Sequence, residues 1–298
     1  MKDFKTLKEN CQSRAVKKKI AVVNANSKSV LMSILEAYKE GLVQPVLIGN
    51  SQEIMDKLKA LEYGLIDKIE IVESSDENMT KVALDYVRSG AADIIMKGAI
   101  ETAPFMSAIV KKENGALKDG NLLNHITILE IPGYHKLVGI TDAALLMYPS
   151  IEEKKIAIDN SISYLKKIGF QEVKVSILAA IEKINPKMPE TVEADLLKKR
   201  YREKKIPGCY VEGPISYDLA MDKRAALEKH YCSPVAGDSD LLVVNNIISG
   251  NLLVKSLTHS AKAVGAGIVL GANIPVVLTS RASSAEAKYR SILLAAAM

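Results

Sequence analysis

The sequence predicts an α/β protein with two parallel-sheet domains around a cleft. Short apolar runs alternate with amphipathic segments along the whole chain, as in βαβ units whose parallel sheet is covered on both faces. The chain has 298 residues, a comfortable length for two domains. Hydrophobic residues make up 48% and charged residues 25%, which is ordinary for a globular enzyme.

The first half of the chain predicts four strand and helix pairs. The first strand is "KKIAVVNAN" (18–26), and the helix after it, 27–41, ends at a glycine stop signal. Three more pairs follow: the strands "QPVLIGN", "KIEIVES" and "ADIIMKGA", and the helices 51–64, 77–90 and 102–115. This alternation predicts one parallel sheet in the first half.

The second half opens with a pair of adjacent strands in "HITILEIPGYHKLVGITDAA" (125–144) and then resumes the alternation. Helices are expected at 150–169, 188–205, 218–230 and 250–265, and strands at "VKVSILAA", "CYVEGPIS" and "DLLVVNN". The remaining strands and a final helix lie in 266–298. A boundary near residue 140 separates two α/β halves, and halves of this kind usually enclose a ligand cleft.

Charge and composition indicate which classes of binding partner and which cell compartment to expect. The formal net charge of +5 favours a small anion slightly, and the basic run "KKRYREKK" (198–205) is interpreted as a solvated helix face, so no nucleic-acid partner is expected. Three scattered cysteines fit a reducing cytoplasm. The polar start of the chain predicts no signal peptide, and the absence of a run of about 18 apolar residues predicts no membrane partner.

Several common sites are absent from the sequence. There is no GxxxxGK[ST] phosphate loop, no GxGxxG after the first strand and no GxSxG nucleophile elbow. The four histidines have no metal-like spacing, so no metal site is expected.

The clearest candidate site is the junction "IPVVLTSRASSAEAKY" near the end of the chain. A strand ends at Ser280 and Arg281, and Ser283-Ser284-Ala285-Glu286 matches a capping box, which predicts a helix from about Ser284. A helix N-terminus, a hydroxyl and a guanidinium together can bind an oxyanion. The alternative is a capped surface helix with an incidental arginine.

A second junction is "MKGAIETAP" (96–104). Lys97 and Gly98 end a buried strand, and Thr102 stands where the next helix begins. Lys97 and Thr102 are candidates to hold a negative group. The alternative is a glycine-permitted turn with a solvated lysine.

Two further junctions belong to the second half. In 233–257, Asn246 closes a strand, Gly250 and Asn251 open the next helix, and Lys255 follows one turn later. Asparagine is also a common turn and cap residue, so a purely structural role remains open. Asp142, after Thr141, is interpreted as a capping residue or a cleft carboxylate.

These junctions together resemble the phosphate acetyl/butyryltransferase family, and the butyryl branch most closely. The resemblance rests on "MKGAIET", "HITILEIPGYHKLVGITDAALLMYPSIEEK", "EGPISYDLAMD", "AGDSDLLVVNNIISGNLLVKSL" and "IPVVLTSRASSAEAKY", in this order through most of the chain. It implies the reversible reaction of acyl-CoA with orthophosphate to give acyl phosphate and CoA. It also implies a fold like isocitrate and isopropylmalate dehydrogenases, with 1–138 and 268–298 forming one domain and 139–267 the other.

The resemblance also assigns roles. Ser280, Arg281 and Glu286 are the catalytic candidates. The candidates for binding phosphate, acyl phosphate or CoA are Lys97, Thr102, Asn246, Gly250, Asn251, Lys255, Ser283 and Lys288. CoA is a substrate in this reaction, no cofactor is bound permanently, and a cytoplasmic homo-oligomer is expected. Fixed donors aimed at the developing charge are the main catalytic resource.

The sequence departs from the family pattern in two places. Acetyltransferases carry an aspartate shortly after the Ser-Arg pair, thought to act as a base, but Ala287 stands there and the nearest carboxylate is Glu286. No arginine lies between Arg88 and Arg200, where the acetyl branch uses arginine for CoA. The base is therefore open, and lysines such as Lys97 can replace the arginine.

Three other functions stay open. One is phosphate acetyltransferase activity. Another is a metal- and NAD-dependent dehydrogenase of the same fold, with Asp218, Asp222, Asp238 and Asp240 as imagined metal ligands. The last is a non-catalytic sensor of acyl-CoA or acyl phosphate.

Overall fold

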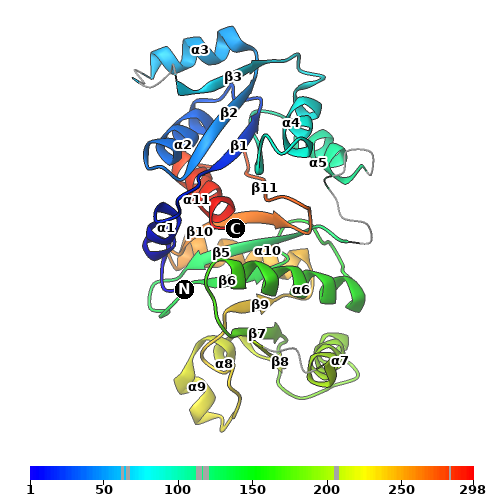
Figure 1. Ribbon diagram of the computed structural model, residues 1–298. Helices are drawn as coiled ribbons and strands as arrows, with labels where there is room; N and C mark the ends of the chain where they lie inside the picture. The colour runs from blue at the N-terminus through cyan, green and yellow to red at the C-terminus, as the bar shows by residue number, and fades with distance from the viewer. Residues whose placement is uncertain (62–63, 65–67, 112–115, 117–120, 205–207, 282) are drawn as a thin grey trace. The chain divides into compact units, whose positions relative to one another are not determined.

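A computed structural model of the chain describes all residues except 62–63, 65–67, 112–115, 117–120, 205–207 and 282. The described chain forms two compact units. One contains 5–121 and 266–298, here called the Arg281 unit; the other contains 1–4 and 122–265, here called the Asn246 unit. Both are α/β, so the predicted fold class is confirmed (Figure 1).

The Arg281 unit has one sheet in the order β3-β2-β1-β4-β11-β10. Neighbouring strands are parallel except β11 and β10, which are antiparallel. Its elements are α1 (Phe4–Gln12), β1 (Lys18–Val23), α2 (Lys28–Lys39), β2 (Val43–Gly49), α3 (Ser51–Ala60), β3 (Glu70–Glu73), α4 (Met79–Arg88), β4 (Ile94–Lys97), α5 (Thr102–Val110), β10 (Val264–Leu270), β11 (Val276–Val277) and α11 (Ala285–Ala296). In Figure 1, α2 lies with α11 and α4 lies with α5.

The Asn246 unit has strands in the order β5-β6-β9-β7-β8. β5 and β6 are antiparallel, as the predicted strand pair requires, and the other neighbours are parallel. Its elements are β5 (Asn124–Glu130), β6 (Val138–Thr141), α6 (Ile151–Lys167), β7 (Val173–Leu178), α7 (Pro189–Lys204), β8 (Cys209–Ile215), α8 (Tyr217–Met221), α9 (Lys223–Glu228), β9 (Leu241–Val243), α10 (Ile247–Lys255) and the π-helical turn η3 (Ser256–Ser260).

Local sequence explains where α2 and β1 begin and end. The last four residues of β1 are fully buried and apolar, as expected for a strand covered on both faces. α2 ends at the predicted glycine: Gly41 has φ +72, and the backbone N–H of Leu42 donates to the carbonyl of Ala37 at 2.9 Å. A left-handed residue at this point lets the chain leave the helix without a Cβ penalty.

The structure adds one helix, α1, at the start of the chain. α1 was not expected, because the first residues are mostly polar, but Phe4, Leu7 and Cys11 are buried along one side of it. The predicted ends of the helices 51–64, 102–115 and 188–205 extend into residues outside the described part of the chain. No helix among the described residues is long and apolar enough to cross a membrane.

The two units differ from the predicted division mainly in the placement of residues 122–138, and also in that of 1–4 and 266–267. The sequence grouped residues 122–138 with the Ser280–Arg281 segment, whereas the unit boundary falls at residue 121. The reason is that β5 and β6 pair in register from Ile126–Thr141 to Leu129–Val138, so a boundary between them would separate a strand pair. The predicted domain limits themselves remain a prediction.

Candidate functional site

Two neighbouring strand ends build the candidate site in the Arg281 unit. β4 and β11 are parallel, with Ile95 opposite Val276 and Met96 opposite Val277. Their carboxyl ends therefore lie at the same edge of the sheet, where α/β proteins bind ligands. Lys97 ends β4, and Ser280 and Arg281 follow β11 by three and four residues. Segments about 180 residues apart in the chain are thus brought together.

Gly98 is required by the packing beneath this edge. A Cβ at Gly98 would lie 2.4 Å from the carbonyl oxygen of Val23 and 2.2 Å from that of Asn24. The backbone N–H of Gly98 donates to that same Val23 carbonyl at 2.8 Å. The interpretation of "KGA" as a glycine-permitted turn is therefore correct, and this turn holds Lys97 at the strand end.

Lys97 is not the solvated lysine of the alternative interpretation. The residue is 2% exposed, and its ammonium donates to the carbonyl of Ile100 at 2.9 Å. Burial lowers the pKa of Lys97, and the nearby positive charges of Arg281 and Lys288 lower this pKa further. These three predicted residues therefore form one cluster of cations.

Lys288 and Arg281 complete this cation cluster. Lys288 is 2% exposed, burial lowers the pKa of its ammonium, and this group donates to the backbone carbonyl of Ser283. The Arg281 side chain is 64% exposed, and its guanidinium lies 4.0 Å from the carboxylate of Glu101. An exposed arginine backed by two buried lysines favours an anionic ligand.

The helix after the Ser-Arg pair begins one residue later than the predicted capping box requires. Ser284 is the N-cap of α11, and its hydroxyl accepts from the N–H of Ala287 at 3.1 Å. The box on Ser283 and Glu286 was wrong, because Ser283 instead closes a turn in which its N–H donates to the carbonyl of Ser280 at 3.1 Å. This turn places the N-terminus of α11 directly after the Ser280–Arg281 pair.

Glu286 and Thr102 lie at the starts of helices. Glu286 is in the first turn of α11, and its exposed carboxylate pairs with Arg290 one turn later. Thr102 is the exposed first residue of α5, next to Glu101. The structure gives Glu286 a partner other than the residues of the cation cluster, so its role as a base remains a prediction.

Thr279 was missed by the sequence analysis. Its hydroxyl oxygen exposes less than 1 Å² and has no hydrogen-bond partner among the described residues. Thr279 stands immediately before Ser280, and this adjacency was the available signal. An unpaired buried hydroxyl in a native structure calls for an explanation.

The four candidates of the Asn246 unit lie on or next to α10: Asn246, Gly250 and Asn251 near its start, and Lys255 at its end. The helix begins at Ile247 with Asn246 as its N-cap, whose side chain accepts from the N–H of Ser249 at 3.0 Å. The prediction that Gly250 and Asn251 open this helix was therefore wrong by one turn. Lys255 is the exposed last residue of α10.

Gly250 and Asn251 both contact the chain after β6. A Cβ at Gly250 would lie 2.7 Å from the carbonyl oxygen of Asp142, so only glycine permits this approach. Asn251 donates to the carbonyl of Ala143 at 3.4 Å. These residues thus have structural partners, and their part in substrate binding remains a prediction.

The carboxylate of Asp142 accepts hydrogen bonds from backbone N–H groups near it. One carboxylate oxygen accepts from the N–H groups of Ala144 and Leu145, each at 2.7 Å, and the other accepts from the N–H of His125 at 2.6 Å. These bonds hold a turn and not a helix start, because α6 begins only at Ile151 with Ser150 as its N-cap, so the interpretation of Asp142 as a helix N-cap was wrong. Burial lowers the pKa of the neighbouring His125 imidazole.

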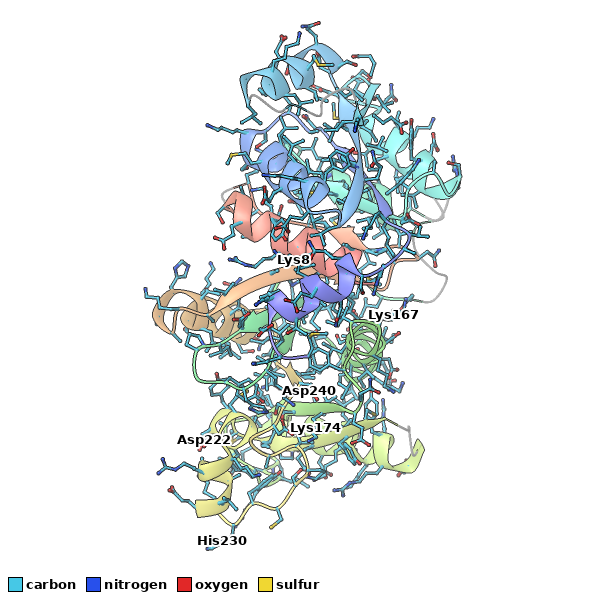
Figure 2. The ribbon with its side chains drawn as sticks, turned by 60° about the vertical axis from the view of Figure 1, so that its left-hand side comes forward. Lys8, Lys167, Lys174, Asp222, His230 and Asp240 are labelled. Atoms are coloured by element: carbon cyan, nitrogen blue, oxygen red, sulfur yellow. The ribbon has the colours of Figure 1, made fainter. Side chains whose placement is uncertain are left out.

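The four aspartates imagined as metal ligands are occupied by other partners. Asp218 pairs with Lys229 at 2.9 Å, and Asp222 accepts from the N–H of Arg224 at the start of α9. Figure 2 shows Lys174 next to Asp240 and Asp222 at the start of α9. Within the described residues, no group of three or more histidine, cysteine and acidic side chains is arranged to hold a metal ion.

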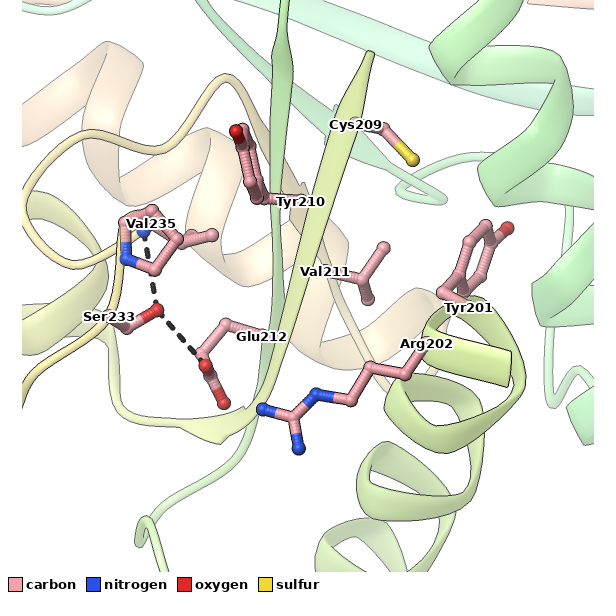
Figure 3. Close-up of a pocket in the computed structure, with 9 residues that line it drawn as sticks. Tyr201, Arg202, Cys209, Tyr210, Val211, Glu212, Ser233 and Val235 are labelled. Atoms are coloured by element: carbon pink, nitrogen blue, oxygen red, sulfur yellow. Dashed lines mark hydrogen bonds between the residues drawn. The ribbon is translucent and has the colours of Figure 1, made fainter. Parts of the chain in front are cut away.

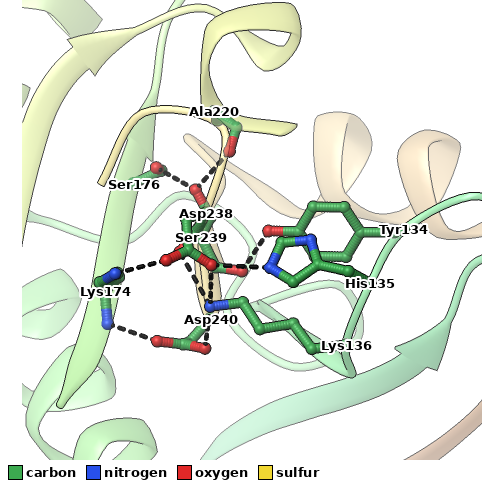
Figure 4. A network of polar contacts seen from close by, with 9 residues as sticks. All are labelled: Tyr134, His135, Lys136, Lys174, Ser176, Ala220, Asp238, Ser239 and Asp240. Carbon is green, nitrogen blue, oxygen red and sulfur yellow. Dashed lines mark hydrogen bonds and ion pairs between the residues drawn. The ribbon is translucent and has the colours of Figure 1, made fainter. Parts of the chain in front are cut away.

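Asp238 and Asp240 belong to a network of lysines (Figure 4). The ammonium of Lys136 lies 2.6 Å from both carboxylates, and Lys174 binds Asp238 through its side chain and Asp240 through its backbone N–H. Hydrogen bonds from Lys136, Lys174 and His135 outweigh burial and lower the pKa of Asp238. The carboxylates thus connect β7 to the chain before β6 and before β9.

Two pockets of the Asn246 unit lie near its strands. One, of about 220 Å³, is lined by Arg202, Cys209, Tyr210 and Glu212, with Ser233 donating to Glu212 at 3.0 Å (Figure 3). Burial raises the pKa of the Cys209 thiol, which disfavours the reactive thiolate. The other, of about 200 Å³, lies at the ends of β7 and β9 and includes Asn245, beside the N-cap of α10.

Comparison with known sequences gives matches over almost the whole chain. Residues 66–296 match the family model described as "Phosphate acetyl/butaryl transferase". A phosphate butyryltransferase of Clostridium acetobutylicum is 37% identical over 99% of this chain and 98% of its own length. A phosphate acetyltransferase of Thermotoga maritima is 36% identical over 95% of this chain and 96% of its own.

Solved structures match as well. A branched-chain phosphotransacylase from Enterococcus faecalis is 30% identical, with a TM-score of 0.84 over 93% of this chain and 97% of its own. A putative 4-hydroxythreonine-4-phosphate dehydrogenase from Salmonella typhimurium is 13% identical, with a TM-score of 0.62 over 95% of this chain and 99% of its own. The second likeness concerns the fold alone and agrees with the dehydrogenase-like fold predicted above.

Proposed function

Because the chain belongs to the phosphate acetyl/butyryltransferase family, we propose that it prefers butyryl or a similar short acyl group and holds phosphate at Arg281. The chain is an acyltransferase that exchanges an acyl group between CoA and orthophosphate. The preferred acyl chain and the roles of individual residues are the parts we propose.

The cation cluster carries the proposal for phosphate binding. Lys97, Arg281 and Lys288 are close enough for the other two charges to lower the pKa of Lys97. Only Glu101, at 4.0 Å from Arg281, offers a nearby carboxylate among the described ion pairs of the cluster. The N–H groups at the start of α11 add donors, and a helix N-terminus favours an anion. A phosphate dianion would offset the repulsion among these cations.

The reaction needs positioning and charge stabilisation. A phosphate oxygen bonds to the thioester carbonyl carbon, the carbon–sulfur bond breaks, and the phosphate proton ends on the departing CoA sulfur. Arg281 would orient phosphate, and Ser280 would donate to the carbonyl oxygen or the thiolate as charge develops. Holding the two reactants together removes part of the barrier otherwise due to their encounter. A thiol with an ordinary pKa of about 8.5 leaves with little acid assistance.

Of the three proposed catalytic residues, Glu286 has the least support from the structure. Its carboxylate is exposed and pairs with Arg290 one turn later on α11, rather than with a residue of the cation cluster. Phosphate that is already dianionic needs no strong base. Ser280 and Arg281 therefore carry the proposal more directly than Glu286 does.

The experiment is phosphate-dependent CoA release from acyl-CoAs of two to five carbons, with wild type, Arg281→Ala and Arg88→Ala. Arg88 is a matched control, because it is an exposed arginine paired with Asp85 on α4. We expect turnover to peak at four carbons and to fall at least about 100-fold in Arg281→Ala, as after loss of a donor to developing charge. A clear acetyl preference would favour the acetyltransferase alternative, and equal activity in both variants would refute the role of Arg281.

Binding of acyl-CoA without turnover would favour the alternative of a non-catalytic sensor. Binding of a nicotinamide cofactor would favour the alternative of a dehydrogenase. A cytoplasmic location, a homo-oligomer and the absence of a permanently bound cofactor complete the proposal. The free, scattered cysteines support the location, because such thiols fit a reducing compartment.

A further inference from the structure

The hydroxyl of Thr279 is the feature of the candidate site that the folded chain itself leaves unexplained. Its oxygen exposes less than 1 Å² and has no hydrogen-bond partner among the described residues. Burying a hydroxyl without a partner costs about 1–3 kcal/mol. Valine has nearly the same shape and avoids this penalty, so packing alone does not account for a threonine.

The position of Thr279 connects its hydroxyl to the cation cluster. Thr279 follows β11 by two residues and precedes Ser280 and Arg281. The register of β11 with β4 continues toward Lys97, which ends β4. The hydroxyl therefore belongs to the segment that carries Arg281, and it lies on the buried side of residue 279.

A rotation of the side chain would make the hydroxyl available. Thr279 is half-buried as a residue, so its exposed part is formed by atoms other than the hydroxyl oxygen. Staggered rotamers of threonine exchange the positions of the methyl group and the hydroxyl about χ1. An acceptor on the exposed side favours the rotamer that points the hydroxyl toward it.

From this placement we infer that Thr279 binds the phosphate substrate, its hydroxyl donating a hydrogen bond to a phosphate oxygen held beside Arg281. The inference deepens the proposed function and rests on it. Thr279 is then a substrate-binding residue whose hydroxyl has no partner among the described residues of the ligand-free protein.

The test compares Thr279→Val with Thr279→Ser. Thr279→Val keeps the shape and removes the donor, so the KM for phosphate should rise about 10-fold or more, as for a hydrogen bond to a charged group. The urea-unfolding stability of the ligand-free protein should stay equal or increase. Thr279→Ser keeps the donor and should retain most of the affinity for phosphate. Inorganic phosphate should raise the melting temperature of wild type and Thr279→Ser more than that of Thr279→Val.

Thr191→Val is the matched control, because the same change there removes a paired hydroxyl. Thr191 is fully buried, accepts from the N–H of Asn185 at 2.9 Å and donates to the carbonyl of Met188 at 2.8 Å. We expect Thr191→Val to lower the stability and to leave the KM for phosphate unchanged.

Three outcomes would contradict the inference, and the measurements distinguish them from one another. A loss of stability in Thr279→Val with an unchanged KM for phosphate would show a structural hydroxyl and overturn the inference. A rise in the KM for acyl-CoA alone would assign the hydroxyl to the thioester and overturn the phosphate assignment. Absence of phosphate-dependent CoA release in wild type would refute the proposed function, and the inference with it.

Discussion

At the scale of single residues, the surroundings of Lys97 determine the pKa of its side chain. The residue ends a buried strand, so its ammonium is removed from water, and Arg281 and Lys288 add positive charge nearby. Both effects disfavour the charged form and lower the pKa of Lys97. The folded protein therefore bears a cost in stability for the charge that would hold an anion.

The free energy of unfolding of Lys97→Met, measured by urea unfolding, should change relative to that of wild type as pH rises toward 10.5, the ordinary pKa of lysine. The unfolded chain keeps this lysine proton up to its ordinary pKa of 10.5, whereas folded Lys97 releases it at lower pH. Between these two pKa values the unfolded state binds more protons, so wild-type stability rises with pH. The free energy of unfolding of wild type should therefore increase relative to that of Lys97→Met as pH rises. A difference independent of pH would contradict the lowered pKa of Lys97.

At the scale of elements, α11 is the helix that supports the site, and its two ends are held differently. At its start, the Ser284 hydroxyl accepts from the N–H of Ala287. At its end, the guanidinium of Arg14 donates to the carbonyls of Ala296 and Ala297 at 2.9 and 2.6 Å. Tyr289, in between, donates to Glu40.

Ser284→Ala should lower the free energy of unfolding by about 1 kcal/mol, the usual loss for a removed N-cap. Ser283→Ala is the control, because Ser283 takes part in the preceding turn through its backbone. Chemical denaturation of both variants measures the difference. An equal or larger loss in Ser283→Ala would restore the capping box predicted from the sequence.

Arg14→Ala should lower the free energy of unfolding by about 1–2 kcal/mol, because it removes two charge-assisted hydrogen bonds from the negative end of a helix. Arg14→Lys should recover part of this loss, since an ammonium can reach a carbonyl but lacks the fork of donors. Thermal and urea unfolding give the comparison. Unchanged stability in Arg14→Ala would show that solvent replaces these bonds.

On the scale of the whole molecule, the chain leaves the Arg281 unit at residue 121 and returns at 266. The returning segment supplies β11, which pairs with β4, and α11, which packs on α2. The early segment alone would expose the buried faces that these elements cover.

A fragment of residues 5–121 should therefore lack a cooperative unfolding transition, whereas the same fragment joined by a Gly/Ser linker to 266–298 should regain one. Asn121 donates to the carbonyl of Gly271 at 2.6 Å, so the linker has to span the five residues from 266 to 271, roughly 17 Å in an extended strand. Circular dichroism during heating measures both. Cooperative unfolding of 5–121 alone would show that α11 and β11 are dispensable for this unit.

Chelation tests the proposed absence of a metal from the reaction. Turnover should be unchanged after dialysis against a chelator, because the thioester carries its own good leaving group. A loss of activity that an added divalent cation restores would contradict this.

The sequence by itself determined the α/β class, most of the strands and helices, and the Ser280–Arg281 junction. These follow from local periodicity and turn chemistry, which a few neighbouring residues express. The family resemblance came from the same local segments.

Only the tertiary structure decided which of these segments meet. Lys97 joins Arg281 and Lys288 because β4 pairs with β11, a contact that no local pattern encodes. Tertiary packing also decided that α11 has Ser284 as its N-cap, that the four aspartates of the Asn246 unit have other partners, and that the Thr279 hydroxyl has none among the described residues. Burial and long-range charge depend on neighbours distant in the chain, so they appear only once the sheet has formed.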